Sequence, residues 1–401
     1  MTDVSTSTDS PTLFDADNHY YEATDAFTRH LDPKMARRAM QWANVDGRQR
    51  LLVGGKINRF IPNPTFDPVA KPGSLDEYFR GRNPEAKGMA ELFGELEPIR
   101  PEYRDRDARL AVMDAQGIDG CFMFPTLAVG MEEALRHDPE AAGAAFVAFN
   151  QWLDEDWGYS YKDRIFAAPM IPLIDITTAV SELDKVLAKG ARIVCIKGGP
   201  VTTPTGYASP ADPRFDPFWS RVNEAGITVG IHSGDAGYGR FVEDWEPHGE
   251  FRAFSHTPLR VVLSADRPPY ETMAALVCQG IFDRFPNVRV ASIEAGSEWI
   301  VPLVKKLAKV RGQMPTGFAS DPVEALRNHV WVAPYYEDDL VAVREALGVE
   351  RLLFGSDWPH AEGLAEPASF ADDLADQGFT VEEIRSIMCD NGRTLTQPAS
   401  A

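Results

Sequence analysis

A unit that occurs four times along the chain constrains its fold more than any other feature. In each copy an amphipathic segment ends at a glycine, and a short apolar run begins one to five residues later: LAVMDAQG-ID-GCFMF, ELDKVLAKG-A-RIVCI, FWSRVNEAG-I-TVGI and VREALG-VE-RLLF. Glycine readily adopts the left-handed conformation that ends many helices, and the apolar run after it is typical of a strand. Strands that are apolar throughout are buried on both faces, which predicts a parallel sheet covered by helices.

Four further apolar runs bring the number of expected strands to eight. They are TLFDADNH near the start, IFAAPMIPL at 165–173, VRVASIEA at 288–295 and VWVAPYY at 330–336. Eight strands that alternate with helices predict an α/β protein, a (β/α)8 TIM-like barrel, with a doubly wound open sheet as the alternative. We number the expected strands 1 to 8 in chain order.

Two connections are too long for a single helix. Residues 20–104, between strands 1 and 2, contain RQRLLV-GG-KINRFI, which predicts a β-hairpin, and a Pro-rich stretch that cannot be regular. We expect this insertion to fold over one mouth of the barrel. Residues 235–270, after strand 5, are rich in aromatic and charged side chains, and they form either a lid or a packed surface excursion.

Composition bounds the remaining organisation of the 401-residue chain. Its 44% apolar content can bury one large core, so we expect a single domain over residues 12–396, after a disordered polar tail over residues 1–11. A net charge of −20 without a Lys/Arg cluster argues against nucleic acid and membranes as main partners. A small-molecule substrate is the expected partner, and whether the chain forms a homo-oligomer stays open.

The cysteines and the first residues of the chain bear on where in the cell the protein is expected. The 4 cysteines lie far apart without a C-x-x-C pair, which predicts free thiols in a reducing environment. The stretch MTDVSTSTDSP lacks the basic and apolar regions of a secretory signal, and no apolar run reaches the length of a spanning helix. We therefore expect a cytoplasmic protein.

Carboxylate and imidazole side chains stand at the ends of four expected strands. Asp17 and His19 end strand 1 on the same face, and His232, Glu294 and Asp357 end strands 5, 6 and 8. In a barrel these ends converge at the mouth where active sites lie. Like charges that close together need compensation, so the pattern predicts one divalent cation, with zinc as first choice and manganese or magnesium as alternatives.

Several of these segments also resemble a known family. DADNH, IHSG, CQGIFDRFPNVRVASIEAGSEWIVPLV and LLFGSDWPHAEG are similar to the amidohydrolase-related family of metal-dependent hydrolases, in the branch that contains aminocarboxymuconate-semialdehyde decarboxylase. The resemblance covers most of residues 12–395, and it implies a (β/α)8 barrel with one divalent metal, usually zinc or manganese. It also implies Asp17, His19, His232 and Asp357 as ligands, with Asp357 handling protons.

The sequence departs from the family pattern at two positions. Many members have His-x-His on strand 1, where this chain has Asp17, and many have His at the end of strand 6, where this chain has Glu294. Both changes keep a ligand or a proton relay available. They make the site more anionic, which weakens the case for zinc and strengthens that for manganese or magnesium as alternatives.

Four further residues are candidates for contacts near the metal. His360, three residues after Asp357, either orients it or touches substrate, or else has only a role in the turn. Lys197 ends strand 4 and is predicted to bind an anionic substrate group; the alternatives are pairing with Glu294 or carbamylation. His256, on the loop after strand 5, is predicted as a substrate contact together with Lys197 and Glu294, although for His256 and the nearby His248 a solvated role is the alternative.

The predicted protein is a metal-dependent enzyme. In the main hypothesis Asp357, His232 and His360 are catalytic, and a metal-activated water hydrolyses a small carboxylate-bearing or cyclic substrate. The alternative is non-oxidative decarboxylation of an aromatic or unsaturated acid. A third hypothesis, from another class, is a barrel that binds small molecules without catalysis.

Overall fold

The computed structural model describes residues 12–247, 253–254 and 257–399. Its parallel strands form two arcs, one in the order β1-β5-β6 and the other in the order β7-β10-β11-β12. The bounds of these strands are β1 (Leu13–Tyr20), β5 (Ile118–Pro125), β6 (Ile165–Ala167), β7 (Ile193–Lys197), β10 (Thr228–His232), β11 (Arg289–Ile293) and β12 (Val330–Val332). The tail predicted over residues 1–11 lies outside the described residues.

Parallel bridges join the two arcs into a closed ring. The bridging pairs are Met170 with Cys195, Val332 with Leu352, and Asn18 with Trp358. The first joins the segment after β6 to β7, and the other two place residues 352–358 between β12 and β1 as the eighth strand. The predicted (β/α)8 barrel is therefore confirmed, and the open doubly wound sheet is wrong. The eighth strand is irregular because Asp357, near its end, has a left-handed backbone with φ 54°.

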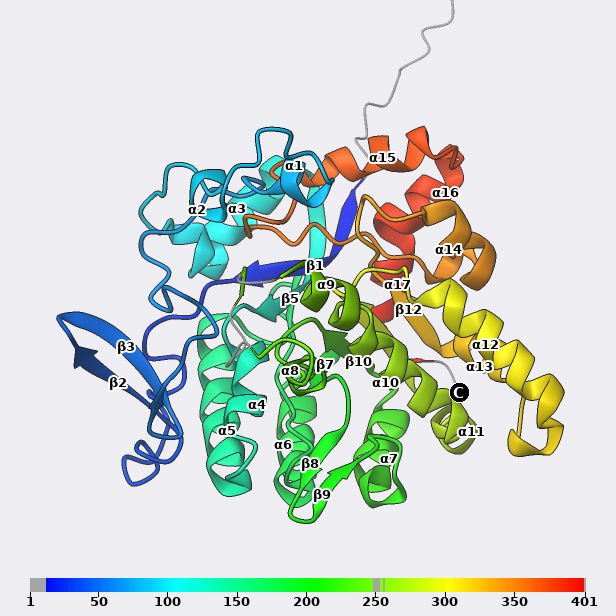
Figure 1. Cartoon of the computed structure of the whole chain (residues 1–401), viewed down its shortest axis with the longest axis horizontal. Coiled ribbons are helices and arrows are strands. Elements are labelled where there is room, and N and C mark those ends of the chain that lie inside the picture. Colours follow the sequence, from blue (N-terminus) through cyan, green and yellow to red (C-terminus); the bar gives the residue numbers. More distant parts are fainter. Residues whose placement is uncertain (1–11, 248–252, 255–256, 400–401) are drawn as a thin grey trace, which may run out of the picture.

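Long helices on the outside connect the strands (Figure 1). They are α3 (Arg106–Gln116), α5 (Pro139–Asp156), α6 (Ile176–Ala188), α7 (Asp216–Ala225), α10 (Arg267–Cys278), α12 (Ile300–Gln313), α13 (Pro322–His329) and α14 (Leu340–Leu347). The glycines of the repeated unit end four of them: Gly117, Gly190, Gly226 and Gly348 have φ of 73°, 91°, 61° and 98°. A residue with a side chain would be strained at these positions, so the glycines mark helix ends as the sequence pattern predicted.

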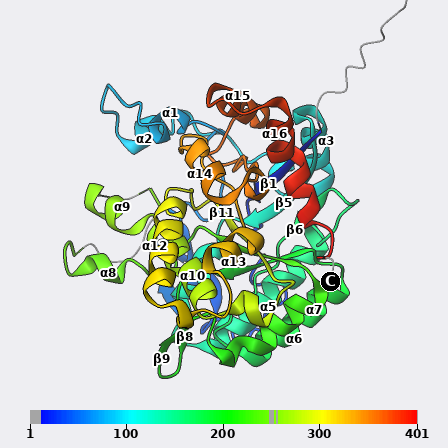
Figure 2. The ribbon, with the colours of Figure 1, turned by 90° about the vertical axis from the view of Figure 1, so that its right-hand side faces the viewer.

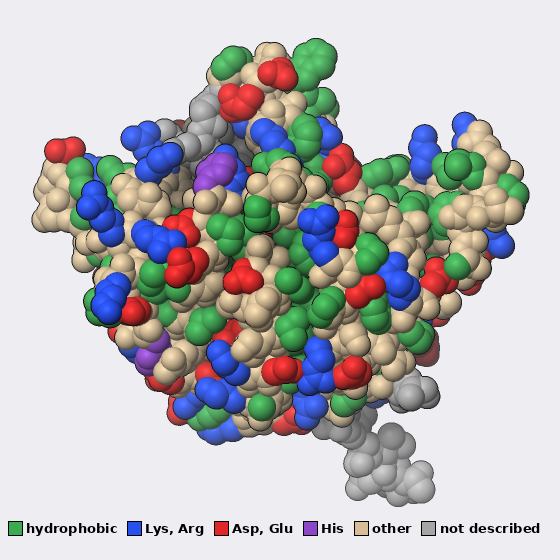
Figure 3. All heavy atoms as spheres, turned by 90° about the horizontal axis from the view of Figure 1, so that it is seen from below, with side chains coloured by type: hydrophobic (Ala, Val, Ile, Leu, Met, Phe, Trp, Pro, Cys, Tyr) green, Lys and Arg blue, Asp and Glu red, His purple; other side chains and the backbone are tan. Residues whose placement is uncertain are grey.

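Shorter elements complete the chain. The short helices are α1 (Asp76–Phe79), α2 (Met89–Leu92), α4 (Met131–Ala134), α8 (Arg240–Glu243), α9 (Pro258–Ser264), α11 (Ile281–Arg284), α15 (Phe370–Asp376), α16 (Val381–Arg385) and α17 (Asn391–Leu395), and a two-stranded ribbon is formed by β8 (Val201–Thr203) and β9 (Gly206–Ala208). Within the described residues, no helix combines the length and apolar character needed to cross a membrane. Basic and acidic side chains are interspersed on the face seen in Figure 3.

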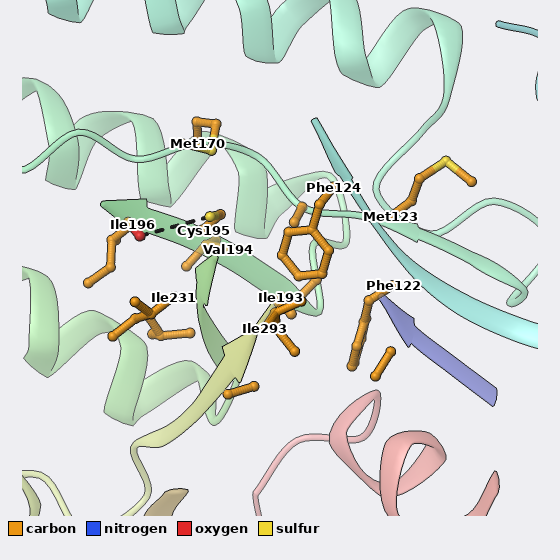
Figure 4. Close-up of a cluster of buried hydrophobic side chains, with 14 of the residues drawn as sticks. Phe122, Met123, Phe124, Met170, Ile193, Val194, Cys195, Ile196, Ile231 and Ile293 are labelled. Carbon is orange, nitrogen blue, oxygen red and sulfur yellow. Dashed lines mark hydrogen bonds between the residues drawn. The ribbon is translucent and has the colours of Figure 1, made fainter. Parts of the chain in front are cut away.

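Apolar side chains fill the inside of the ring, beneath the strand ends that bear the candidate ligands. Side chains from several strands meet inside the ring in Figure 4, among them Phe122 and Phe124 of β5, Ile193 of β7 and Ile293 of β11. Gly230 of β10 makes room for this packing, because a Cβ there would lie 3.0 Å from the Phe124 ring. The Phe124 ring lies 4.8 Å from the imidazole of His232, measured between centroids, so the floor of the mouth is apolar and closely packed.

The insertion between β1 and β5 contains the predicted hairpin. Strands β3 (Arg48–Val53) and β4 (Lys56–Ile57) pair antiparallel across Gly54 and Gly55, whose φ values are 58° and 76°. Strand β2 (Met40–Val45), which the sequence did not reveal, pairs with β3 and extends the hairpin into a projecting sheet (Figure 1).

The insertion also reaches the eighth strand. The backbone N–H of Gly73 donates to the carbonyl of His360 at 3.1 Å, and the N–H of Leu75 donates to that of Ala361 at 2.7 Å. A Cβ on Gly73, at φ 72°, would lie 2.8 Å from Ala365, so this close approach requires glycine. The insertion thus covers the loop that follows Asp357.

The long connection after β10 meets the insertion from the other side. Helices α8 and α9 project from the body of the molecule in Figure 2. The N–H of Ala253 donates to the carbonyl of Phe60 at 2.9 Å, and the rings of Phe254 and Phe93 lie edge to face at 5.2 Å. His248 and His256, predicted on this connection, lie outside the described residues, and its role as a lid stays a prediction.

Candidate metal centre and active site

The five strand-end residues meet in one small volume. Asp17 and His19 come from β1, His232 from the end of β10, Glu294 directly follows β11, and Asp357 lies on the eighth strand. All are buried except the Glu294 side chain, which is 21% exposed. The expectation that barrel topology brings these strand ends together is met for every one of them.

The donor atoms are evenly spaced. From His19 Nε2, the distances are 3.2 Å to Asp17 Oδ1, 3.4 Å to Glu294 Oε2, 3.3 Å to Asp357 Oδ1 and 3.2 Å to His232 Nε2. From His232 Nε2, Asp17 Oδ1 lies at 3.4 Å and Glu294 Oε2 at 3.2 Å. Ligands at about 2.1 Å from one cation stand roughly 3.4 Å apart in a tetrahedron. For Asp17, His19, His232 and Glu294, the observed spacing fits a divalent cation held in common.

The hydrogen bond of His232 shows which of its nitrogens is free. Its Nδ1 lies 2.8 Å from the carbonyl oxygen of Ser233, which can only accept, so Nδ1 carries a hydrogen and a neutral ring would present its lone pair at Nε2. That lone pair faces His19 Nε2 at 3.2 Å and two carboxylates. A neutral ring oriented in this way is prepared for a metal.

Protons take the place of the cation in the electrostatics of this centre. Burial acts to lower the pKa of His19, but the hydrogen bonds to Asp17 and Glu294 outweigh it and raise this pKa to about 10. Burial and the nearby charge of Glu294 raise the pKa of Asp357 well above its usual range. Within the described residues, no Lys or Arg nitrogen lies within 4.0 Å of Asp17, Glu294 or Asp357. Positive charge at this centre must therefore be a proton or a bound cation.

Two of the carboxylates stand on a strained backbone. Glu294 and Asp357 have φ of 50° and 54°, a region that residues with a Cβ rarely occupy. The surroundings hold them there: the Tyr335 hydroxyl donates to the carbonyl of Glu294 at 2.8 Å, and the Asp357 N–H donates to the carbonyl of Asp17 at 2.8 Å. Strain of this kind is characteristic of functional sites, because it aims a side chain where a regular strand would not.

His360 lies beside the centre, in contact with Asp357. Its Nδ1 is 2.6 Å from Asp357 Oδ1, and its ring lies 4.0 Å from that of His19. Burial and the neighbouring His19 lower the pKa of His360 well below its ordinary value. A second group of possible metal donors contains His360 with His19, Glu294 and Asp357. The position fits the predicted partner of Asp357.

Lys197 makes a contact that the sequence did not predict. Its Nζ lies 3.4 Å from Glu133 Oε2 and 3.4 Å from the carbonyl of Pro200, and its side chain is 7% exposed. It therefore pairs with Glu133, and not with Glu294. Lys197 and His232 also line a cavity of about 10 Å³, which is the size of one water. Binding of a substrate anion by Lys197 stays a prediction.

Sequence reasoning missed an inner carboxylate that organises the centre. Asp15 Oδ1 accepts from the N–H groups of Asp17 and Ser356 at 3.1 and 2.9 Å, and Oδ2 accepts from Ser356 Oγ at 2.6 Å and Asn18 Nδ2 at 2.9 Å. It ties the strand that carries Asp17 to the strand that carries Asp357. Nothing in the motif DADNH distinguishes Asp15, because its partner Ser356 is far away in the sequence.

Two other residues near the centre were also missed. Glu362 lies in the quoted motif LLFGSDWPHAEG, and burial together with the charge of Glu294 raises its pKa to about 8. Thr126 directly follows β5, and its Oγ1 lies 2.8 Å from His360 Nε2. The rule that active-site residues follow barrel strands could have found Thr126.

Comparison with known proteins agrees with this geometry. Residues 15–395 match the family model described as amidohydrolase. No curated protein matches the chain by sequence. A crystal structure of an amidohydrolase from Mycobacterium avium subsp. paratuberculosis K-10 is 47% identical, with a TM-score of 0.90 over 96% of this chain and 99% of that one.

Two more distant structures share the fold. 5-Carboxyvanillate decarboxylase of Sphingomonas paucimobilis is 16% identical, with a TM-score of 0.56 over 96% of this chain and 99% of that one. A dihydroxybenzoic acid decarboxylase of Polaromonas sp. JS666, solved with manganese and the inhibitor 2-nitroresorcinol, is 17% identical, with a TM-score of 0.57 over 82% of this chain and 94% of that one. With its family match along nearly the whole barrel, the chain belongs to the amidohydrolase family of metal-dependent enzymes.

Proposed function

We propose that the protein is a metal-dependent hydrolase that acts on a small carboxylate-bearing or cyclic substrate. The observation that carries the proposal is a pair of overlapping donor groups that share His19 and Glu294. The first adds Asp17 and His232, and the second adds Asp357 and His360, which are in contact at 2.6 Å. The cation would supply Lewis-acid activation of a water or of a substrate oxygen.

The donor set bears on which cation is held. Asp17, His19, His232 and Asp357 are the proposed ligands. Glu294 lies with the first three in one group of donor atoms, and with His19, Asp357 and His360 in a second group. Zinc in structural sites prefers four ligands rich in imidazole or thiolate, whereas carboxylates suit manganese and magnesium. Zinc is the first choice from the sequence, and the three carboxylates support manganese as the rival to test against it.

Protons are handled by the chain's own residues. Asp357 is placed to take a proton from the attacking water, and His360 Nδ1, 2.6 Å away, is placed to share it. Glu294 touches both His19 and His232, and it can hold a second proton or orient the substrate. Phe124 beneath His232 keeps the floor of the site dry, which strengthens these interactions.

A decarboxylase acting on an aromatic or unsaturated acid is the second candidate. The same 2.6 Å contact favours it, because two acceptor atoms at that distance require a proton between them, and such a proton can be delivered to carbon. The anionic surroundings argue against it, since a substrate carboxylate would meet Asp17 and Glu294. Lys197, the predicted anion site, would have to leave Glu133 to bind such a group.

Product analysis separates the two candidates. The protein, loaded in turn with zinc, manganese and magnesium, is incubated with small amides, esters and lactones and with aromatic acids, and release of acid or of carbon dioxide is measured. We expect hydrolysis that is lost in Asp357→Asn and kept in the control His137→Gln, which changes an exposed side chain. Turnover of aromatic acids alone would favour the decarboxylase. Equal activity of wild type and Asp357→Asn would refute both.

A further inference from the structure

A buried guanidinium near the metal centre forms no ion pair with any carboxylate of the described residues. It belongs to Arg109 of α3, which is fully buried. Its Nε and Nη1 donate to two neutral oxygens, the carbonyl of Glu102 at 2.8 Å and Oδ1 of Asn18. A buried charge is normally paired with an opposite charge, so its use here to hold an amide oxygen calls for an explanation.

Two indole rings also contact this guanidinium. Arg109 Cζ lies 4.4 Å from the centre of the Trp358 ring and 5.6 Å from that of the Trp157 ring, which are cation–π distances. Trp358 directly follows Asp357 on the eighth strand. Arg109 therefore contacts the ends of two strands of the barrel, β1 through Asn18 and the eighth strand through Trp358.

The contact with Arg109 fixes which way the Asn18 amide faces. A guanidinium donates hydrogen bonds and cannot accept them, so it must face the amide oxygen. The N–H₂ group of the amide then points to Asp15 Oδ2, at 2.9 Å. A flipped amide would set its N–H₂ group against the guanidinium and its oxygen against Asp15 Oδ2, and both hydrogen bonds would be lost.

The orientation of Asn18 matters because Asp15 joins two strands of the centre. Asp15 Oδ1 accepts from the N–H groups of Asp17 and Ser356 at 3.1 and 2.9 Å, and Oδ2 accepts from Ser356 Oγ at 2.6 Å. Backbone N–H groups cannot reverse, and the Ser356 hydroxyl accepts from the N–H of Trp358 at 3.1 Å, which leaves its hydrogen for Asp15. Among these four hydrogen bonds, the one from Asn18 is the one that an amide flip would turn into a repulsion.

We propose that Arg109 is a positioning residue for the metal centre: it holds the Asn18 amide in the orientation that completes the hydrogen bonds of Asp15. Asp15 in turn joins the strand ends that carry Asp17 and Asp357. The inference rests on the proposed function, in which these two residues are metal ligands. Among the described residues, Arg109 makes no direct contact with a ligand, and it acts on the centre through Asn18.

The first variant removes the donor to Asn18. Arg109→Met keeps a long, unbranched side chain at the buried position and removes every hydrogen-bond donor from it. We expect this variant to bind metal about 10-fold more weakly than wild type, because Asn18 can then flip away from Asp15. Competition between the protein and a chelator for Mn²⁺, and separately for Zn²⁺, measures the affinity.

Combining this change with Asp15→Asn gives the sharper result. In Asp15→Asn the new amide can face the N–H₂ group of Asn18, which Arg109 holds in place. Once Arg109→Met is added, Asn18 can flip and accept a hydrogen bond from the new amide. We therefore expect the double variant to bind Mn²⁺ at least as tightly as Asp15→Asn alone. If the two losses of affinity multiplied instead, Arg109 would act independently of Asn18, and the proposal would be wrong.

Arg289→Met is the matched control. Arg289 is also a buried arginine, 8% exposed, but it begins β11, at the opposite end of that strand from Glu294. Its Nη2 donates to the carbonyls of Gly226 and Gln397, each at 2.6 Å. We expect the control to lose stability and to keep its metal affinity. The same result for Arg109→Met would mean that Arg109 has only a structural role.

A second variant keeps the proposal testable if Arg109→Met does not fold. The ammonium in Arg109→Lys can still donate to Asn18 Oδ1, so we expect a metal affinity close to that of wild type. A loss as large as that of Asp15→Asn would refute the proposal.

These measurements need no substrate, so they separate the inference from the proposed function. If no substrate is turned over, the proposed function fails, while the affinities still decide the role of Arg109. Wild-type metal affinity in an active Arg109→Met would overturn the inference and leave the proposed function standing.

Discussion

Two groups of buried carboxylates lie at the mouth of this barrel, and their charge is balanced in opposite ways. In the metal-centre cluster, Asp17, Glu294 and Asp357 have only imidazoles as positive partners among the described residues. In the Lys197 cluster, which consists of Glu132, Glu133, Arg136 and Lys197, the Glu133 carboxylate touches Lys197 at 3.4 Å and Arg136 at 3.3 Å.

This difference in charge balance indicates which of the two clusters is a cation site. Both clusters contain buried carboxylates, and buried carboxylates alone would not separate them. The Lys197 cluster carries its own cations and needs nothing further. The metal-centre cluster has imidazole nitrogens and carboxylate oxygens about one ligand edge apart, with no Lys or Arg side chain between them among the described residues. Only this cluster is incomplete without an ion.

The largest expected effect follows from removing a metal ligand. We predict that His232→Ala loses both its bound cation and its activity, because the substitution removes one of the proposed ligand atoms. Elemental analysis of protein purified without chelators, together with activity measurements, checks this. His30→Ala is the control, since His30 pairs with Glu155 at 2.7 Å outside the cluster. A full metal complement in His232→Ala would show that the ligand assignment is wrong.

In the Lys197 cluster the same kind of substitution should act on stability alone. Glu133→Gln removes the carboxylate that contacts the buried Lys197 ammonium, and breaking such a pair typically costs about 3–5 kcal/mol. We expect a lower midpoint of denaturant unfolding, with an unchanged metal content. The double variant Glu133→Gln, Lys197→Met should recover part of the loss, since the buried ammonium that lost its paired carboxylate is also removed. Loss of metal in Glu133→Gln would mean that the two clusters are coupled.

The pH dependence of stability gives a smaller effect in the same cluster. Burial raises the pKa of Glu132 from its ordinary 4.5 to about 7, although Lys197 acts to lower it. The folded protein therefore binds this proton more tightly than the unfolded chain, and stability falls as pH rises from about 4.5 to 7. When the pKa of a group differs by one between the folded and unfolded states, the free energy of unfolding changes by about 1.4 kcal/mol.

Glu132→Gln should remove this contribution. We expect the variant to lose stability less steeply than wild type across that pH range, when unfolding of the two proteins is followed by denaturant titration at a series of pH values. The difference between the two curves isolates Glu132 from the other buried carboxylates, such as Glu22 and Glu337, whose pKa values are also raised to about 7. Parallel curves would refute the assignment.

The comparison also explains what the sequence could predict. The metal-centre cluster could be predicted because each of its residues ends a strand, and each strand can be recognised from its own short apolar run. Barrel topology then brings the strand ends together. The partner of Lys197 was not visible, because Glu133 lies on the short helix α4, outside the pattern of long helices. Strand β2 was missed because its partner β3 belongs to the inserted hairpin, whose pairing no barrel rule describes.

Asp15 could be predicted only in part, and it allows a test of what holds the metal centre together. Its two oxygens accept four hydrogen bonds from Asp17, Asn18 and Ser356, so they join the strands that carry Asp17 and Asp357. Its place within DADNH was visible in the sequence, while its bond to Ser356, 341 residues later, was not. Asp15 touches no donor of the metal-centre cluster except through the backbone of Asp17.

We predict that Asp15→Asn weakens metal binding by about 10- to 100-fold while the fold is retained. An amide in place of Oδ1 would point its N–H₂ group at the N–H groups of Asp17 and Ser356. If the new amide nitrogen took the place of Oδ2, it would face the N–H₂ group of Asn18. The Asn18 amide cannot flip to avoid this, because its oxygen accepts a hydrogen bond from Arg109. Either orientation sets donor against donor and separates the two strands.

Competition with a chelator measures the affinity, and excess metal should restore activity to Asp15→Asn, because the ligands themselves remain. Ser356→Ala, which removes one of the four donors, should weaken binding less than Asp15→Asn does. If Asp15→Asn bound metal as tightly as wild type, the strand ends would be held by the barrel alone. Asp15 would then be a buried carboxylate that does not contribute to metal binding, as we expect for Glu133 in the Lys197 cluster.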